Sequence, residues 1–481
     1  MSVKKDTVTG MKWLIGSSVL QRIIALLTTA VLARMLGPST YGLFAYAMIV
    51  VTSFELFKSL GIDAALLRRD KDFALAADTT FWIIPFLGIS LYILLFISAP
   101  LIGRFLNSEV LVDVVKVLGI IFVLNCFGRV PNIVLDKKMQ FHSIAIAEFI
   151  SKIMFSITAI VLAFLGWGIW SLVYAYIIQS AIRIFYICKK SGWAPTYKFD
   201  FKLALEMLNF GKFIFFTTIL WFIKMNLDNI LVGKLLGTTM LGFYAISFNV
   251  ANFGADFFGS KIYRVMYPAY ARLRSEGKSL KPAFFKITRF ITLIALPFAV
   301  TVLLLSREML YFVYGEKWLQ ASECLRILAF AGFFNAASTG IGGVYLAEGK
   351  PKYSFFVTAL QVGLFFLFII PFARKFGLEG VSIVVSLVGA ITFFMSMRWV
   401  KKVLKFKAKE IINEIKPIVI SVIVMSILIS VFKLMLWVSI DNKFFHINFI
   451  VLGLLSMFVY FRVLKLLKKD MLKELLELVK I

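Results

Sequence analysis

The chain has 481 residues, of which 60% are hydrophobic and 16% are charged, and its mean hydropathy is +0.90. Soluble domains are roughly 45–50% apolar and about 25% charged, so this composition excludes an ordinary soluble protein and indicates a protein embedded in a bilayer. The net charge of +27 would suit nucleic-acid binding in a soluble protein. The placement of the basic residues, described below, indicates instead that they set the orientation of the chain in the membrane. No nucleic-acid partner is expected.

Fourteen apolar stretches follow one another along the chain, and each is long enough to be a membrane-spanning helix of about 20 residues. Lipid cannot hydrogen-bond an open backbone, so every span must be helical. The predicted fold class is an all-α integral membrane protein with about 14 transmembrane helices. The predicted spans are 13–36, 41–60, 79–101, 111–130, 144–165, 168–187, 209–232, 241–260, 286–306, 323–345, 354–373, 378–399, 417–437 and 445–464.

Most basic residues fall on the cytoplasmic side when the N-terminus is placed in the cytoplasm and successive loops alternate between the two sides of the membrane. On that assignment, 39 of the 53 Lys and Arg residues lie in cytoplasmic segments or adjoining helix ends, 9 lie outside and 5 lie within spans. Cytoplasmic loops of membrane proteins carry such an excess of Lys and Arg. The pattern predicts a multi-pass protein of the cell (inner or plasma) membrane, with both termini cytoplasmic and with basic residues facing the headgroups of membrane lipids.

An internal repeat appears at an offset of 200 residues. Residues 31–47 (VLARMLGPSTYGLFAYA) align without gaps to residues 231–247 (LVGKLLGTTMLGFYAIS), and both segments join one span to the next. Identical pairs include Gly37 with Gly237 and Gly42 with Gly242. Six spans separate the copies, so both copies face the same way, which predicts two parallel six-helix bundles.

The repeat, the loops and the composition divide the chain into six parts. The predicted parts are an N-terminal six-helix bundle (1–190), a cytoplasmic linker (191–208), a C-terminal six-helix bundle (209–400), a basic cytoplasmic loop (401–416), transmembrane helices 13 and 14 (417–466), and an amphipathic cytoplasmic tail (467–481). Two bundles around an axis are an arrangement typical of transporters, in which one bundle rocks against the other.

Short motifs give a resemblance to a known family. The run from Leu36 to Ala45 (LGPSTYGLFA), the run from Asp228 to Gly237 (DNILVGKLLG) and Tyr267-Pro268-Ala269-Tyr270 resemble segments of polysaccharide-export flippases. These proteins belong to the multidrug/oligosaccharidyl-lipid/polysaccharide exporter superfamily. The similarity extends from about residue 10 to residue 400, and the motifs within it are short and mostly structural.

The resemblance implies a function and a set of partners. It implies flipping of a polyprenyl-pyrophosphate-linked oligosaccharide from the cytoplasmic to the outer leaflet, for surface polysaccharide biosynthesis. A polysaccharide polymerase and glycosyltransferases would then act beside the chain. No cofactor is expected, and coupling to a proton or sodium gradient would depend on the intramembrane carboxylates described below.

Charged residues inside spans are costly and mark candidate functional positions. Arg22 lies in the middle of the first span, and Lys224 and Asp228 lie one turn apart in the seventh. On the bundle interface, Arg22 and Lys224 would attract a pyrophosphate, to which a guanidinium binds bidentately. These three residues are the predicted substrate-binding residues. The alternative is that Lys224 and Asp228 form an internal i,i+4 pair and that Arg22 extends toward the interface.

A second group of charges lies closer to the span ends, where contact with interfacial water is a simpler explanation. Within this group, Glu55 and Asp256 are the candidates for ion coupling, because a carboxylate in a low dielectric can change its protonation near neutral pH. The other members are Lys58, Lys116, Glu148, Lys152, Glu323 and Arg326.

The sequence contains few motifs that would indicate an enzyme. Asp70-Lys71-Asp72 matches a three-residue pattern of sugar-nucleotide transferases, but a solvated, charged cytoplasmic loop is the better explanation. The two histidines and three cysteines form no metal-ligand spacing, and no phosphate-binding loop is present. The predicted protein is a transporter and not an enzyme. The alternatives are an ion-coupled drug or cation exporter of the same superfamily, a lipid II flippase, and a membrane-embedded glycosyltransferase or polymerase.

Overall fold

The computed structural model describes residues 20–255, 269–435, 437–468 and 471. Every regular element within these residues is a helix. The chain forms two compact units, Met1–Gly242 (unit 1) and Phe243–Ile481 (unit 2). Helix α10 (Thr238–Ala251) crosses from one unit to the other.

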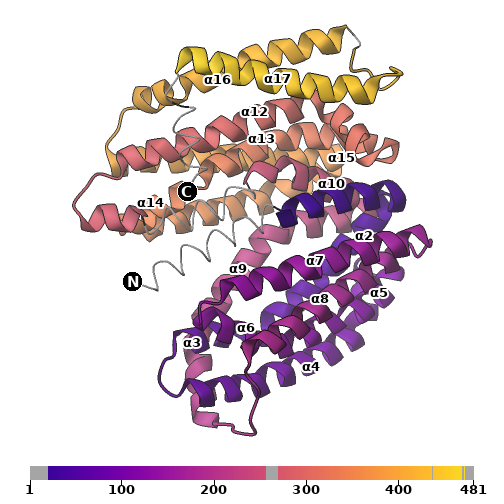
Figure 1. Ribbon diagram of the computed structural model, residues 1–481, viewed down its shortest axis with the longest axis vertical. Coiled ribbons are helices and arrows are strands. Elements are labelled where there is room, and N and C mark those ends of the chain that lie inside the picture. Colours follow the sequence, from indigo (N-terminus) through magenta and orange to yellow (C-terminus); the bar gives the residue numbers. More distant parts are fainter. Residues whose placement is uncertain (1–19, 256–268, 436, 469–470, 472–481) are drawn as a thin grey trace. The chain divides into compact units, whose positions relative to one another are not determined.

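Unit 1 is a helical bundle in which α4, α6, α7 and α8 run alongside one another (Figure 1). Its first described helix covers residues 20–36. The helices that follow are α2 (Pro38–Ser59), α3 (Ile62–Arg68), α4 (Phe73–Phe105), α5 (Val110–Leu118), α6 (Ile120–Lys137), α7 (Phe141–Phe164), α8 (Ile169–Ser191) and α9 (Phe201–Leu236). Helix α9 begins inside the stretch expected to be a linker, because Asp200 caps it by accepting a hydrogen bond from the amide N–H of Leu203.

Unit 2 is also helical, and its last two helices, α16 and α17, pack side by side (Figure 1). Helix α16 also packs along α12. The elements are α12 (Lys281–Tyr314), a 3₁₀ turn (Glu316–Ala321), α13 (Ser322–Ser338), α14 (Ile341–Ala347), α15 (Pro351–Leu404), α16 (Ala408–Leu434) and α17 (Phe445–Leu467).

Eleven of the described helical segments are long and apolar enough to cross a membrane. Helix α15 covers two predicted spans, 354–373 and 378–399, which meet at Gly377, where the backbone is non-helical (φ 57°, ψ −136°). The first and eighth predicted spans reach beyond the described residues, so the count of 14 stays a prediction. Most of the tail predicted at 467–481 also lies outside the described residues.

The repeat predicted from the sequence has a matching backbone. Gly37 has φ 78° and ψ 172°, and Gly237 has φ 88° and ψ 173°. This region of φ/ψ space is open almost only to glycine. At both positions one helix ends and the next begins directly, so the two copies make the same sharp reversal.

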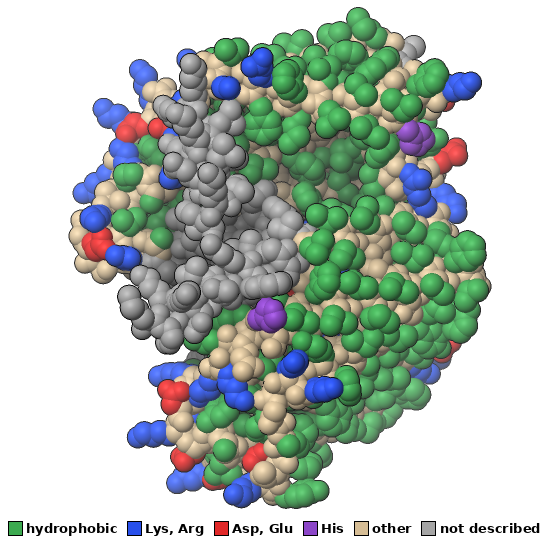
Figure 2. All heavy atoms as spheres, viewed as in Figure 1, with side chains coloured by type: hydrophobic (Ala, Val, Ile, Leu, Met, Phe, Trp, Pro, Cys, Tyr) green, Lys and Arg blue, Asp and Glu red, His purple; other side chains and the backbone are tan. Residues whose placement is uncertain are grey.

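The outward faces of the helices are apolar. Phe86 is 71% exposed, Phe164 83% and Leu434 82%. Figure 2 shows hydrophobic side chains over most of the visible helix surface. Exposed apolar side chains on this scale need lipid around them, because water would oppose their exposure. The protein is therefore a multi-pass membrane protein.

Candidate functional site

Arg22 lies on a helix that is fixed against α7. The buried hydroxyl of Thr28 donates a hydrogen bond to Ser156 Oγ at 2.7 Å and therefore joins the first described helix to α7. One turn from Ser156 stands Lys152, whose charge interacts repulsively with that of Arg22. By its position in the sequence, Lys152 belongs only to the second group of charges, near a span end. The structure brings it together with Arg22.

Lys152 has an unusual environment for a cation. Its Nζ lies 4.8 Å from the centroid of the Phe155 ring, and it makes no ion pair with a carboxylate in the described part of the chain. Lys152 is therefore a cation among apolar helices, and an anion bound beside it would offset part of the cost of its charge. The pair formed by Arg22 and Lys152 is hereafter called the dibasic site.

Lys224 and Asp228 lie on α9 but do not bind each other. Asp228 is 6% exposed, and its Oδ1 accepts hydrogen bonds from the backbone N (2.8 Å) and Nδ2 (3.1 Å) of Asn229. Lys224 is half-buried and pairs with no carboxylate among the described residues. The internal i,i+4 pair considered as an alternative is therefore not formed. The role of these two residues in substrate binding stays a prediction.

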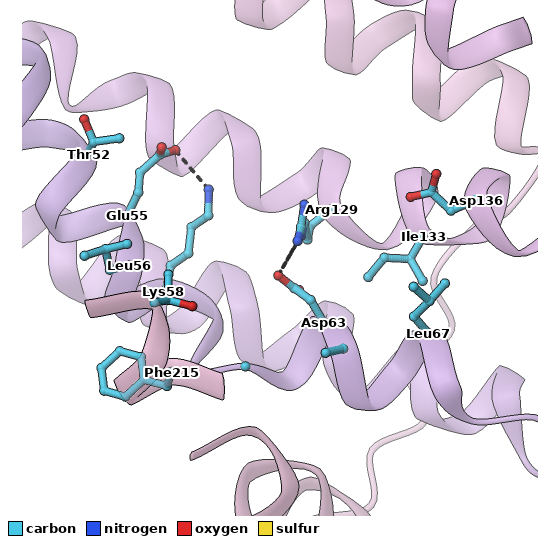
Figure 3. A pocket seen from close by; sticks show the side chains of 13 residues that line it. Thr52, Glu55, Leu56, Lys58, Asp63, Leu67, Arg129, Ile133, Asp136 and Phe215 are labelled. Atoms are coloured by element: carbon cyan, nitrogen blue, oxygen red, sulfur yellow. Dashed lines mark hydrogen bonds and ion pairs between the residues drawn. The ribbon is translucent and has the colours of Figure 1, made fainter. Parts of the chain in front are cut away.

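Glu55 lies in a pocket of about 500 Å³ inside unit 1 (Figure 3). Four helices, α2, α3, α6 and α9, supply the lining. Its residues are Thr52, Glu55, Leu56, Lys58, Gly61, Asp63, Ala64, Leu67, Arg129, Ile133, Asp136, Phe215 and Thr218. Three carboxylates and two bases therefore face a single cavity, which we call the polar pocket.

Glu55 is held from two sides in the polar pocket. Lys58 Nζ lies 3.0 Å from Glu55 Oε1, and Asn125 Nδ2 donates to the same oxygen at 3.0 Å. The Glu55 side chain is 24% exposed and that of Lys58 is 13% exposed. This carboxylate is therefore fixed in position and largely screened from solvent, which increases the strength of its charge interactions.

A second ion pair crosses the pocket from α3 to α6 (Figure 3). Arg129 donates from Nε at 2.7 Å and from Nη2 at 2.6 Å, and both bonds reach Asp63 Oδ2. The other oxygen, Oδ1, is buried and accepts no hydrogen bond within the described structure. Two donors on one oxygen leave the second oxygen of Asp63 able to accept a proton or a hard cation.

The third carboxylate, Asp136, belongs to a chain of polar contacts between α6 and α8. Asn132 Nδ2 donates to Asp136 Oδ2 at 2.9 Å, and Arg183 Nη2 donates to Asn132 Oδ1 at 3.2 Å. Sequence reasoning found Glu55 but missed Asp63, Arg129 and Asp136. Asp63 and Arg129 are 66 positions apart, and no local spacing shows that they meet.

Asp256, the second candidate for ion coupling, lies outside the described residues. Cys126, Cys188 and Cys324 are free thiols. No cluster of three or more metal-ligating side chains occurs in the described ranges.

Two relatives whose names give a biosynthetic pathway align with most of this chain. It is 25% identical over 400 residues to the teichuronic acid biosynthesis protein TuaB of Bacillus subtilis (strain 168), with 83% of each chain covered. It is 25% identical over 399 residues to the lipopolysaccharide biosynthesis protein WzxC of Escherichia coli (strain K12), covering 82% of this chain and 81% of that one.

Solved structures show the same fold. The lipid II flippase MurJ in an inward closed conformation has a TM-score of 0.73 and 16% identity, covering 95% of this chain and 99% of MurJ. An inward-facing multidrug-resistance transporter of the MATE family, from the MOP superfamily, has a TM-score of 0.59 and 19% identity. The match covers 81% of this chain and 96% of that one.

A family-level match runs through both units. Residues 31–323 match the family described as polysaccharide biosynthesis protein. This range contains Lys152 of the dibasic site and all residues that line the polar pocket. The chain belongs to the polysaccharide biosynthesis protein family.

Proposed function

We propose that the chain is a transporter that flips a polyprenyl-pyrophosphate-linked oligosaccharide from the cytoplasmic to the outer leaflet. Family membership, relatives named for teichuronic acid and lipopolysaccharide biosynthesis, and the fold shared with MurJ all support this function. The observation that carries the proposal is the dibasic site, in which two cations stand among apolar helices and would compensate an anionic headgroup.

The chemistry of the substrate explains why such a site is needed. A pyrophosphate carries negative charge through a region of low dielectric, and Arg22 and Lys152 would compensate it. The planar guanidinium of Arg22 supplies directional, paired hydrogen bonds, and Lys152 supplies a compact charge. Lys224 and Asp228 on α9 are proposed as further substrate contacts.

Alternating access between two bundles would move the bound headgroup from one side of the membrane to the other. The polar pocket is the proposed site of coupling to a proton or sodium gradient in the N-terminal half. Glu55 and the buried Oδ1 of Asp63 are the acceptors there, and Asp256 is their proposed counterpart in the C-terminal half. Binding of a cation would weaken the ion pair that joins α3 to α6 and would shift the balance between conformations.

We also propose a membrane and an orientation for the protein. It would lie in the inner or plasma membrane with both termini in the cytoplasm, as the distribution of Lys and Arg indicates. Glycosyltransferases would supply the lipid-linked oligosaccharide on the cytoplasmic side. A polysaccharide polymerase would consume it on the outer side.

Reconstitution tests the proposal. Purified protein is placed in liposomes, and transfer of a fluorescent polyprenyl-pyrophosphate oligosaccharide between leaflets is followed with and without an imposed proton or sodium gradient. We expect transfer well above that of protein-free liposomes. Transfer of lipid II alone, or efflux of a cationic dye with no lipid transfer, would contradict the proposed substrate and support one of the other transporter types.

A further inference from the structure

The segment between α8 and α9 is fixed to the first turns of α4. Asp78, which is 4% exposed, accepts a hydrogen bond from the backbone N of Thr196 at 3.0 Å and another from the Thr196 hydroxyl. Trp82 Nε1 donates to the carbonyl oxygen of Thr196 at 2.8 Å. The backbone N of Asp200 donates to Thr79 Oγ1 at 3.2 Å. This connection is therefore held in a defined conformation.

The held segment presents aromatic rings outward. Residues 197–202 read Tyr-Lys-Phe-Asp-Phe-Lys, so that aromatic and charged residues alternate. Tyr197 is 96% exposed, Phe199 51% and Phe201 73%. The Tyr197 ring stacks on Trp82 with centroids 5.8 Å apart. Three large exposed rings on a fixed backbone are unfavourable in water, so they indicate an apolar or amphipathic surface as the partner.

The same segment is basic. Lys198 and Lys202 are exposed, and Lys189 and Lys190 lie exposed in the last turn of α8. The acid among them, Asp200, caps α9 through its Oδ1, which accepts from the backbone N of Leu203 at 3.0 Å. Its charge is therefore already compensated by the start of that helix. The lysines leave a net positive surface that is complementary to an anionic partner.

We propose that residues 197–202, together with Trp82, form a binding site for anionic lipid headgroups. The segment follows α8, a candidate span that ends at Ser191, and its neighbour Trp82 lies within α4, another candidate span, which places the segment beside the boundary between membrane and water. Aromatic rings favour the depth of the headgroups, and lysines bind lipid phosphates. Because its backbone is fixed by Asp78 and Thr79, the site is preformed. It selects anionic lipid whether or not the chain is transporting, so it is independent of the proposed substrate.

Photo-crosslinking at one position tests this site. The full-length protein carries Tyr197→p-benzoyl-phenylalanine and is placed in nanodiscs of equimolar phosphatidylglycerol and phosphatidylcholine. Mass spectrometry gives the ratio of the two lipids crosslinked at residue 197. The same photo-reactive residue in place of Phe366, which is 55% exposed within α15, gives the ratio for bulk lipid.

We expect phosphatidylglycerol to be enriched at least threefold at residue 197 relative to position 366. Adding Lys198→Gln and Lys202→Gln should return the ratio to the bulk value. Adding Lys401→Gln and Lys402→Gln, two exposed lysines at the end of α15, should leave the enrichment unchanged. Crosslinks only to protein, or an enrichment that survives loss of Lys198 and Lys202, would overturn the proposal.

Discussion

Gly42 and Gly242, equivalent positions of the repeat, each contact the backbone of the residue that begins the helix in the other copy. A Cβ built on Gly42 would lie 1.7 Å from the carbonyl oxygen of Thr238. A Cβ built on Gly242 would lie 2.0 Å from the carbonyl oxygen of Pro38. Positions 38 and 238 are themselves related by the offset of 200, so the contact is reciprocal. Only glycine allows two helices to approach so closely.

Gly42→Ala should therefore destabilise the protein. An alanine in a helix is normally favoured over glycine by roughly 0.5–1 kcal/mol, but a clash with backbone forces the helices apart and costs about 1–3 kcal/mol. The second effect exceeds the first. Thermal unfolding in detergent should show a lower midpoint for this variant.

Gly453→Ala is the matched control, because Gly453 lies in α17 with nothing within 4 Å of a built Cβ. Its midpoint should stay unchanged or rise. If Gly42→Ala behaves like this control, the close contact between the two copies does not exist in the membrane protein.

Asp63→Asn tests the ion pair across the polar pocket. The variant removes a charged acceptor that receives two donors from Arg129, and hydrogen bonds to charged groups are worth about 1.5–3 kcal/mol. Since the Arg129 side chain is 42% exposed, the loss should fall toward the lower end. The free energy of unfolding, measured by denaturant titration in mixed micelles, reports it.

Asp70→Asn provides the comparison for this ion pair. Asp70 lies 3.0 Å from Lys137 but its side chain is 90% exposed, so the free energy of unfolding should barely change. Equal effects of the two substitutions would show that the pocket is as open to water as the surface loop is.

Tyr460→Phe tests the attachment of the last two helices. Tyr460 is 2% exposed, and its hydroxyl donates to the carbonyl oxygen of Leu293 on α12 at 2.7 Å. Losing this buried hydrogen bond should cost about 1 kcal/mol. Tyr174→Phe keeps the ring contacts with Trp167 and Trp170 and should cost nothing measurable. An unchanged stability of Tyr460→Phe would mean that this hydrogen bond does not help to hold α17 on α12.

Glu55→Gln tests coupling in the polar pocket. Glutamine keeps the size of the side chain but cannot carry the charge, so the stimulation of transfer by an ion gradient should fall at least tenfold. Transfer without a gradient should persist. Glu206→Gln, in an exposed pair with Arg69, should keep the stimulation. Full stimulation in Glu55→Gln would remove Glu55 from the coupling mechanism.

The sequence predicts the membrane spans and the repeat because both depend on local properties. Apolar length identifies a span regardless of its neighbours, and Gly37 and Gly237 adopt the same backbone because each must reverse the chain between two helices. Helix α9 extends beyond its predicted span, since hydropathy marks the lipid-embedded part of a helix and not the capped turns beyond it.

The sequence predicts the candidate site less completely, because a site depends on which helices meet. Hydropathy identifies Arg22 as a charge inside a span, but its partner Lys152 is found only when the first helix packs on α7. The spacing of Lys224 and Asp228 permits an ion pair, yet Asp228 instead accepts hydrogen bonds from Asn229. Local spacing gives the opportunity for a contact, and competing partners decide whether it forms.

The most direct measurement of the central claim compares leaflet transfer of the polyprenyl-pyrophosphate oligosaccharide by the wild type, Arg22→Ala, Lys152→Ala and Lys317→Ala. Lys317 is exposed in the turn between α12 and α13 and serves as the control. The account predicts that each dibasic-site variant loses at least tenfold in transfer rate while it inserts and folds normally, and that Lys317→Ala transfers like the wild type. Wild-type rates in both Arg22→Ala and Lys152→Ala would contradict the claim that these two cations carry the pyrophosphate across the membrane.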